Sequence, residues 1–512
     1  MTSCSGGGGG GSGGSITTTN TSSPTPAAPL APPPTDPSPT SAPSSAEVGR
    51  NYGLAAINAP AAYAAGSTGQ GITVALIDSG IDTDHSEFTG RIHPQSTDIV
   101  SGSRANLNDT NGHGTHVAGI VGAAADRSGV VGVAPDSQLL AIRANARGDG
   151  ISEDELLFFD ADVANAINRA VSNGAQVINL SFGKLSSISD DYDDAIARAV
   201  ANDVLIVAAA GNEPSGETTR PASFAGSGDA RGRILAVGAV GRDENIASFS
   251  SQPGFTDLNE SFLVAPGVDI RSTATGGGLG TRSGTSFATP HVTGAAAVLK
   301  SAFPSLTMRQ VADLLLETAK DLGEPGPDPV YGQGLIDLDA ALAPSGTLSI
   351  ATGSTVDGGQ ASISNTELSL GAAFGDALTS SAALSSVMAL DSYDRPYAVN
   401  LSNQVVQTEP SFGLDALLID GPNAHTSSLP ASIAGSQAGL AWRAEETRLW
   451  DRGHTGFRAD DSPETSLNRF DFSGTNQEVS WRVGYGLGAS TLLTSAPKAS
   501  GSESLFWQSQ SL

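Results

Sequence analysis

Ser286 is the residue whose type and position most directly suggest chemistry. It lies just after a glycine and just before an apolar run, residues 292–299, which is expected to form a buried helix. At a helix start, the unpaired N–H groups and the positive end of the helix dipole favour negative charge. They would therefore stabilise an oxyanion formed when the Ser286 hydroxyl attacks a carbonyl. The alternative is a serine that only caps the helix, which is the commoner use of this residue type.

Three further residues could complete such a site. Asp78 ends an apolar run and is followed by a turn sequence, and a buried carboxylate there needs a hydrogen-bonded partner. His113 stands at the start of an apolar helical segment, where an imidazole oriented through one nitrogen can take a proton through the other. Asn212 follows a Gly turn and offers an amide N–H to an oxyanion. Alone, each has a plain structural explanation. Together, the four favour Asp78 as orienter, His113 as base, Ser286 as nucleophile and Asn212 as oxyanion donor.

The elements that must position these residues follow an alternating pattern. Short runs rich in Val and Ile alternate with longer amphipathic segments between about residues 71 and 342, which is typical of parallel strands joined by helices. Predicted strands are 72–78, 138–143, 176–181, 204–210, 234–240 and 261–264; predicted helices are 114–125, 155–173, 190–202, 286–302 and 307–319. This pattern predicts an α/β fold with a doubly wound, mostly parallel sheet. In such sheets, sites gather at the carboxyl ends of the strands.

Composition divides the chain into three parts. Residues 1–48 are Gly, Ser, Thr and Pro with almost no large apolar side chain, so we expect a disordered tether there. Residues 49–343 form the predicted α/β domain, with order expected to begin near Asn51. Residues 344–512 are rich in Ser, Thr, Gly and Ala with alternating stretches, which predicts a loop-rich, β-leaning region.

Charge and cysteine content narrow the classes of function. The formal net charge of −27 opposes binding to nucleic acid or to an anionic membrane surface. Cys4 is the only cysteine, so neither an intrachain disulfide nor a thiolate metal cage can form. A cysteine followed by Ser and six glycines is also compatible with a lipid anchor at Cys4 on a flexible tether. The sequence contains no run of 18 apolar residues that could cross a bilayer as a helix.

The order Asp, His, Asn, Ser resembles that of the subtilisin-like serine proteases over roughly residues 50–343. The resemblance is carried by residues 78–80 (Asp-Ser-Gly), 113–116 (His-Gly-Thr-His) and 284–290 (Gly-Thr-Ser-Phe-Ala-Thr-Pro). It implies the subtilisin fold and a serine endopeptidase that cleaves proteins or peptides through an acyl-enzyme. It also implies two extended edges that pair with the substrate and flank its pocket. These edges are Ser181, Phe182 and Gly183, and Ala209, Ala210 and Gly211.

The resemblance bears on metals and on the other histidines as well. It implies that His116 and His291 are structural and that catalysis needs no cofactor, whereas structural calcium is compatible with the family. Asp82, Asp84 and His85 are too small a cluster to predict a metal site.

A narrower resemblance is to the autotransporter branch of these proteases. Residues 51–59 resemble the lead-in of that branch, and residues 368–378 and 391–397 resemble its linker after the protease domain. This resemblance implies a monomer that is secreted or held at the cell surface in association with the outer membrane. The alternative function is a surface adhesion or binding passenger that uses the protease domain as a scaffold.

Overall fold

The computed structural model describes residues 43–100, 106–146, 156–183, 190–214, 218–227, 232–254 and 256–351, and after these the segments 360–362, 368–371, 387–401, 405–408, 431–437, 440–448, 465–475 and 480–485. The chain divides into two compact units, residues 1–339 and 340–512. Cys4 and the proposed lipid anchor lie outside the described residues.

A seven-stranded sheet forms the centre of the first unit. Its strands are β1 (Thr73–Asp78), β2 (Thr97–Asp98), β3 (Gln138–Arg143), β4 (Val177–Leu180), β5 (Leu205–Ala209), β6 (Ile234–Val240) and β7 (Phe262–Pro266). They lie in the order β2-β3-β1-β4-β5-β6-β7, and every neighbouring pair is parallel. The side chains of β4, β5, β6 and β7 are buried throughout, because helices and loops cover both faces of the sheet. The predicted doubly wound α/β fold is therefore confirmed.

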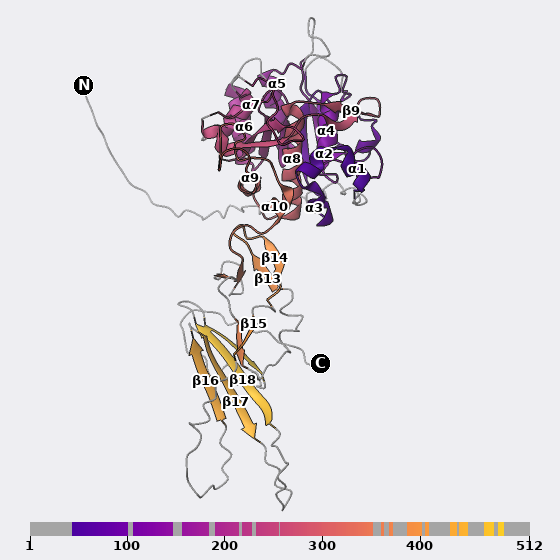
Figure 1. The fold of residues 1–512 in the computed structure, drawn as a ribbon. Coiled ribbons are helices and arrows are strands. Elements are labelled where there is room, and N and C mark those ends of the chain that lie inside the picture. Colours follow the sequence, from indigo (N-terminus) through magenta and orange to yellow (C-terminus); the bar gives the residue numbers. More distant parts are fainter. Residues whose placement is uncertain are drawn as a thin grey trace, which may run out of the picture. The chain divides into compact units, whose positions relative to one another are not determined.

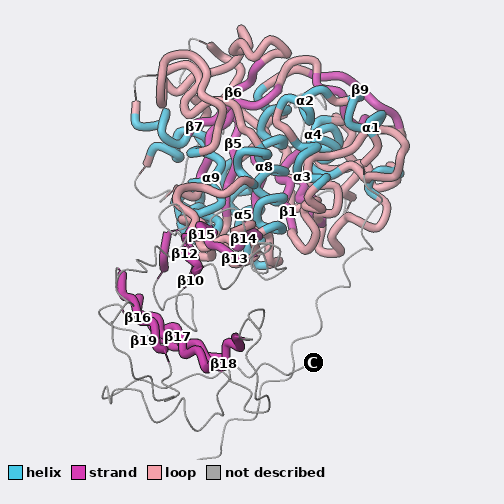
Figure 2. Tube along the Cα trace, turned by 60° about the horizontal axis from the view of Figure 1, so that its bottom comes forward, coloured by secondary structure: helices cyan, strands magenta, loops and turns pink. Residues whose placement is uncertain are grey.

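Helices pack around this sheet and on one another (Figure 1). The helices are α1 (Ser45–Arg50), α2 (Tyr52–Ala56), α3 (Ala59–Ala64), α4 (His113–Gly122), α5 (Asp160–Ser172), α6 (Asp190–Ala201), α7 (Arg220–Ser223), α8 (Thr285–Ala302), α9 (Met308–Glu317) and α10 (Leu338–Leu342), with three short 3₁₀ turns at Ser86–Phe88, Phe224–Gly226 and Asp257–Ser261. Helices α5 and α6 pack on each other, and α4 packs on α8. Figure 2 shows α8 and α9 beside the neighbouring strands β5 and β6. The carboxyl end of β1 and the amino ends of α4 and α8 carry the residues of the site.

A hairpin that the apolar pattern does not predict connects β7 to α8. Strands β8 (Ile270–Ala274) and β9 (Gly278–Arg282) pair antiparallel, with Ile270 opposite Arg282. Strand β9 reads Gly-Leu-Gly-Thr-Arg and is largely exposed, so it lacks the alternation that identifies a half-buried strand. The hairpin ends directly before the loop that leads to Ser286.

Ordered structure begins before the expected start near Asn51. Helix α1 lies at the end of the stretch assigned to the tether, and a capping box stabilises its start. In this box, the Ser44 side chain accepts a hydrogen bond from the Glu47 N–H, and the Glu47 carboxylate accepts one from the Ser44 N–H. The composition of residues 1–48 as a whole conceals this local signal.

The lead-in that follows α1 contacts the helix that carries Ser286. The Asn51 side-chain amide lies 3.3 Å from His291 Nε2, and Tyr52 donates a hydrogen bond to the Val268 carbonyl. Gly53 faces the same imidazole so closely that a Cβ at this position would lie 2.4 Å from His291 Nε2. Asn51 and His291 are both buried, so this contact allows little adjustment.

The second unit contains mostly antiparallel strands and, among its described residues, a buried ion pair. Its strands are β10 (Ser349–Ala351), β11 (Gln360–Ser362), β12 (Leu368–Gly371), β13 (Val387–Leu390), β14 (Pro396–Val399), β15 (Val405–Thr408), β16 (Ala431–Gln437), β17 (Leu440–Arg448), β18 (Thr465–Thr475) and β19 (Ser480–Tyr485). Arg395 is fully buried and lies 2.6 Å from Asp391. Arg395 also donates hydrogen bonds to the carbonyls of Ala341 and Ala343. Arg395 therefore provides donors for carbonyl groups at and just beyond the end of α10.

We expect Gly53→Ala to destabilise the first unit by about 1–3 kcal/mol, because the added methyl overpacks against the buried His291 ring. The matched control is Gly49→Ala in α1, where a Cβ would have no neighbour within 4 Å. The control should gain a few tenths of a kcal/mol to about 1 kcal/mol from helix propensity. Urea unfolding of both variants measures the difference, and equal midpoints would contradict the assigned packing.

Candidate active site

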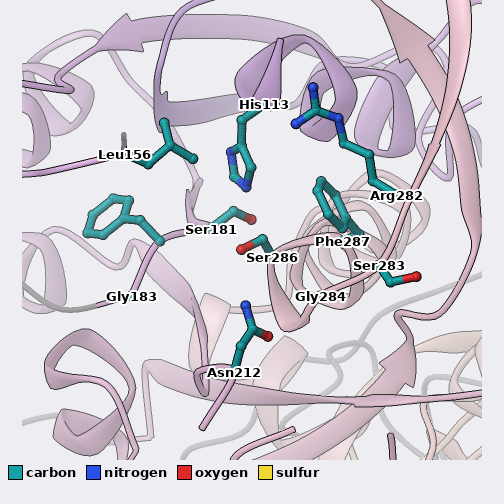
Figure 3. A pocket seen from close by; sticks show the side chains of 11 residues that line it. His113, Leu156, Ser181, Gly183, Asn212, Arg282, Ser283, Gly284, Ser286 and Phe287 are labelled. Carbon is teal, nitrogen blue, oxygen red and sulfur yellow. The ribbon is translucent and has the colours of Figure 1, made fainter. Parts of the chain in front are cut away.

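Asp78 and His113 form a buried pair at the carboxyl end of β1. His113 Nδ1 lies 2.8 Å from Asp78 Oδ1, and the Asp78 side chain is 1% exposed. The same carboxylate oxygen accepts the Ser79 N–H at 2.7 Å. An Nδ1–H that donates to Asp78 leaves Nε2 of His113 as the proton acceptor, and Figure 3 shows the His113 ring directed towards Ser286.

A close approach of α4 to β1 makes this pair possible. A Cβ at Gly114 would lie 2.2 Å from the Gly80 carbonyl oxygen and 3.1 Å from Asp78 Cβ. Only glycine allows the first turn of α4 to lie this close to the end of the strand. His113, the first residue of α4, is thereby brought next to Asp78.

Asp109 fixes the loop before α4, a role that the sequence analysis missed. This buried carboxylate accepts hydrogen bonds from the N–H groups of Gly112 and Thr115 and from the hydroxyls of Ser79 and Thr115. The Ser79 hydroxyl in turn accepts the Gly114 N–H. Asp109 thus holds the residue that follows Asp78 and the first turn of α4 together. Its negative charge also faces a helix start, where it is favoured.

Ser286 is the second residue of α8 and is partly exposed. The helix continues through Pro290 to Ala302, although Pro290 has no N–H to donate to the carbonyl four residues before it. The predicted start at residue 286 is therefore within one residue of the observed start at Thr285. The alternative, a Ser286 that only caps the helix, is not seen, since Gly284 occupies the N-cap position.

Asn212 is held by the residue that precedes Ser286. Its Oδ1 accepts hydrogen bonds from the Thr285 N–H at 2.9 Å and from the Thr285 hydroxyl at 3.1 Å. With the amide oxygen fixed in this way, the Nδ2 donor faces the pocket beside Ser286 (Figure 3). Thr285 was not expected to act here. The sequence signal is only its place between a Gly and the predicted nucleophile.

A cavity of about 540 Å³ surrounds these groups (Figure 3). It is lined by His113, Leu156, Ser181, Phe182, Gly183, Asn212, Arg282, Ser283, Gly284, Ser286 and Phe287. Three of the predicted substrate-contacting residues, Ser181, Phe182 and Gly183, are therefore beside the predicted nucleophile. Leu156 and Arg282 are pocket residues that the sequence analysis did not identify.

Ala209, Ala210 and Gly211, which were expected to form a second substrate-pairing edge, are not among the residues that line this cavity. Their backbone groups are used within the protein. Ala210 N–H donates to the Val237 carbonyl, Gly211 N–H donates to the Thr285 hydroxyl, and the Ala209 and Ala210 carbonyls both accept from Thr219. That these three residues pair with the substrate backbone stays a prediction.

Comparison with known proteins identifies the family. A model of the subtilase family matches residues 69–334, which is more than half of the chain. The chain belongs to the subtilase family. Subtilisin Savinase from Lederbergia lenta is 38% identical over 291 residues, covering 57% of this chain and 97% of the relative. Subtilisin E from Bacillus subtilis is also 38% identical over 291 residues, covering 57% of this chain and 70% of the relative. The protein is therefore a serine-type endopeptidase.

Two further histidines of this subtilase are buried and held by hydrogen bonds. His116 Nε2 donates to the Ile270 carbonyl, and its ring packs against Phe287 at 4.9 Å between centroids. His291 Nδ1 donates to the Phe287 carbonyl, and Nε2 accepts from Asn51. Burial lowers the pKa of His116 to about 4, and the charge of Arg282 adds to this; burial likewise lowers the pKa of His291 to about 4. Both imidazole rings are therefore neutral near pH 7 and serve as packing groups.

The small cluster at residues 82–85 of the subtilase is occupied by internal hydrogen bonds. Asp82 accepts the N–H groups of Asp84 and Gly276, and His85 Nε2 contacts the Gly278 carbonyl. Among the described residues, no group of three or more His, Cys, Asp or Glu is arranged to hold a metal ion. Within the same residues, no helix has both the length and the apolar character needed to cross a bilayer.

The buried histidines predict a loss of stability in acid. Their folded pKa values near 4 lie below the unfolded value of about 6.5, so the unfolded chain binds more protons between these pH values. The stability that they contribute is present above about pH 6.5 and is lost as the pH falls towards 4. We expect His116→Gln to reduce the slope of unfolding free energy against pH in this window. The reduction should be at most the slope that corresponds to one bound proton. Urea unfolding in a Ser286→Ala background avoids self-digestion, and an unchanged slope would contradict the prediction.

Proposed function

We propose that Ser286, His113 and Asp78 carry out the endopeptidase reaction through an acyl-enzyme. The Ser286 hydroxyl attacks the scissile carbonyl while His113 Nε2 takes its proton, and Asp78 holds and stabilises the resulting imidazolium. His113 then gives the proton to the leaving amine. Water attacks the ester in the second half of the reaction, with His113 again as base, and releases the acyl product and free Ser286.

The observation that carries this proposal is the buried contact between His113 and Asp78, with the imidazole directed towards a serine at a helix start. A neutral histidine oriented in this way can act only through Nε2, which is the nitrogen that faces Ser286. A serine that merely capped α8 would not need such a partner, and Gly284 already occupies the cap position.

Asn212 and the Ser286 backbone N–H are proposed as the donors to the oxyanion. The hydrogen bonds from Thr285 support this role, because they leave the amide N–H₂ as the part of Asn212 that faces the cavity. Thr285 is then a positioning residue. Fixed donors of this kind stabilise charge as it develops and need not reorganise during the reaction.

The substrates are proposed to be proteins or peptides bound in an extended form against Ser181, Phe182 and Gly183. The position of these residues beside Ser286 supports that role. Strand addition of this kind gives affinity with little demand on substrate sequence. The proposed machinery consists entirely of groups from one chain, which supports a monomeric enzyme that needs no cofactor for catalysis. Structural calcium remains a proposal that rests on the family alone.

We further propose that the enzyme belongs to the autotransporter branch and acts outside the cell, either secreted or held at the outer membrane. The lead-in at residues 51–59 and the linker at residues 391–397 support this assignment by their resemblance to that branch. Labelling of intact cells with an antibody against the first unit tests the location, and labelling only after lysis would refute it.

We expect Ser286→Ala to abolish peptide hydrolysis, with a loss of at least about 10⁴-fold in kcat, because the nucleophile is removed. The measurements are turnover of a fluorogenic peptide and covalent labelling by a fluorophosphonate. The control is Ser283→Ala, a serine three residues away in the same loop, which should keep its label. Unchanged turnover in the Ser286 variant, with its circular dichroism preserved, would refute the assignment.

We expect Asn212→Ala to lower kcat by about 10²- to 10³-fold with little change in KM, because the lost donor acts mainly on the transition state. Thr285→Val should lower kcat less, since the Thr285 backbone N–H still holds the Asn212 oxygen. Steady-state kinetics on one peptide separates the two parameters. An effect confined to KM would argue against an oxyanion role.

A further inference from the structure

Among the described residues that line the active-site cavity, Arg282 is the only one whose side chain carries a permanent charge. It is exposed and lies at the end of β9, four residues before Ser286. No carboxylate of the described residues lies within ion-pair distance of its guanidinium. A cation in this position is available to a ligand in the cavity, although it plays no part in the chemistry proposed above.

The guanidinium is held beside the loop that carries His113. Arg282 Nη2 donates to the Asn111 carbonyl at 3.2 Å, and a Cβ at Gly112 would lie 3.1 Å from the same nitrogen. Since Gly112 directly precedes His113, the charge lies next to the group that delivers a proton to the leaving amine. Within the described part of the chain this is the one hydrogen bond of the guanidinium, so its other N–H donors face a ligand without a protein partner there.

The position of Arg282 relative to the cleft decides which part of the substrate it meets. The acyl part is proposed to lie along residues 181–183, and Figure 3 shows Gly183 and Leu156 on one side of His113 and Arg282 on the other. An extended peptide runs in opposite directions from its scissile carbon. The part after the scissile bond therefore leaves past His113 on the side of Arg282.

We propose that Arg282 selects substrates with an acidic residue, Asp or Glu, in the first two positions after the scissile bond. A planar guanidinium with free donors matches a carboxylate in both charge and geometry. A basic residue in the same place would be repelled. This inference rests on the proposed roles of Ser286 and His113, because these define the leaving side of the cleft.

Each protein variant is given the same set of peptides, and only the ratios of cleavage between peptides are compared. A change in the overall rate of a variant therefore cancels. A denatured protein digest is cleaved, and mass spectrometry of the products gives the preferred residues on each side of the bond. Matched fluorogenic peptides then carry Glu, Gln or Lys directly after the bond, and in a second set one position further on. The measured quantity is the ratio of kcat/KM for Glu to that for Gln, together with the ratio for Lys to Gln.

We expect the wild-type protein to favour Glu over Gln roughly two- to fivefold, the size expected of one exposed ion pair. Arg282→Gln should bring this ratio close to one, and Arg282→Glu should invert the preference towards Lys. The matched control is Arg271→Gln, an exposed arginine in the other strand of the same hairpin that does not line the cavity. This control makes the same change in net charge and should keep the wild-type ratio.

Ionic strength gives a second measure. The Debye length falls to about 3 Å in 1 M salt, so the preference for Glu should nearly vanish there in the wild-type protein. A wild-type ratio close to one in both peptide sets, or the same ratio in Arg282→Gln as in wild type, would overturn the inference and leave the proposed protease intact. A wild-type protein that neither cleaves peptides nor takes a fluorophosphonate label would instead refute the proposed function itself.

Discussion

The carboxylate of Asp78, buried beside the His113 imidazole, is the constraint on which the rest of the site depends. Removal of a negative charge from water is costly unless donors compensate for it. Asp78 receives two such donors on one oxygen, the Ser79 N–H and His113 Nδ1. Both lie where they do because a parallel strand ends and a helix begins within a few Å of each other. The central sheet, the glycine at 114 and the network around Asp109 all serve to maintain that approach.

A second set of contacts fixes the position of Ser286 relative to His113. Helix α8 packs against five strands of the sheet and against α4, so its first turn cannot shift independently of His113. Phe287 lies between the two helices and contacts the rings of both His113 and His116. Thr285 joins α8 to the strand that ends near Asn212. The positions of Ser286, His113 and Asn212 are thus coupled through packing.

The sequence predicted most of the first unit because its strands are unambiguous. Runs such as 138–143 and 234–240 are apolar, rich in β-branched and aliphatic residues, and bounded by turns, and both strands have the predicted bounds. The four proposed site residues could be predicted because each lies at a strand end or helix start, where the fold brings such residues together. Hairpin β8–β9 was missed because Gly and Thr in an exposed strand give no periodic signal, and Arg282 was missed with it. The hydrogen bonds that residues 209–211 make to Thr219 and Thr285 could not be predicted either, since they depend on tertiary contacts that no local pattern encodes.

The contact between Asn51 and His291 also bears on how the enzyme folds. These residues are separated by 240 positions, and Asp78 and Ser286 by more than 200, so the site is assembled from distant parts of the chain. When such distant residues come together, the chain loses the entropy of closing a long loop before the new contacts stabilise it. Folding is slow for this reason. We therefore expect Ser286 and His113 to come together only when most of the domain is already compact. A protease built in this way has no assembled site of its own while its chain is still extended.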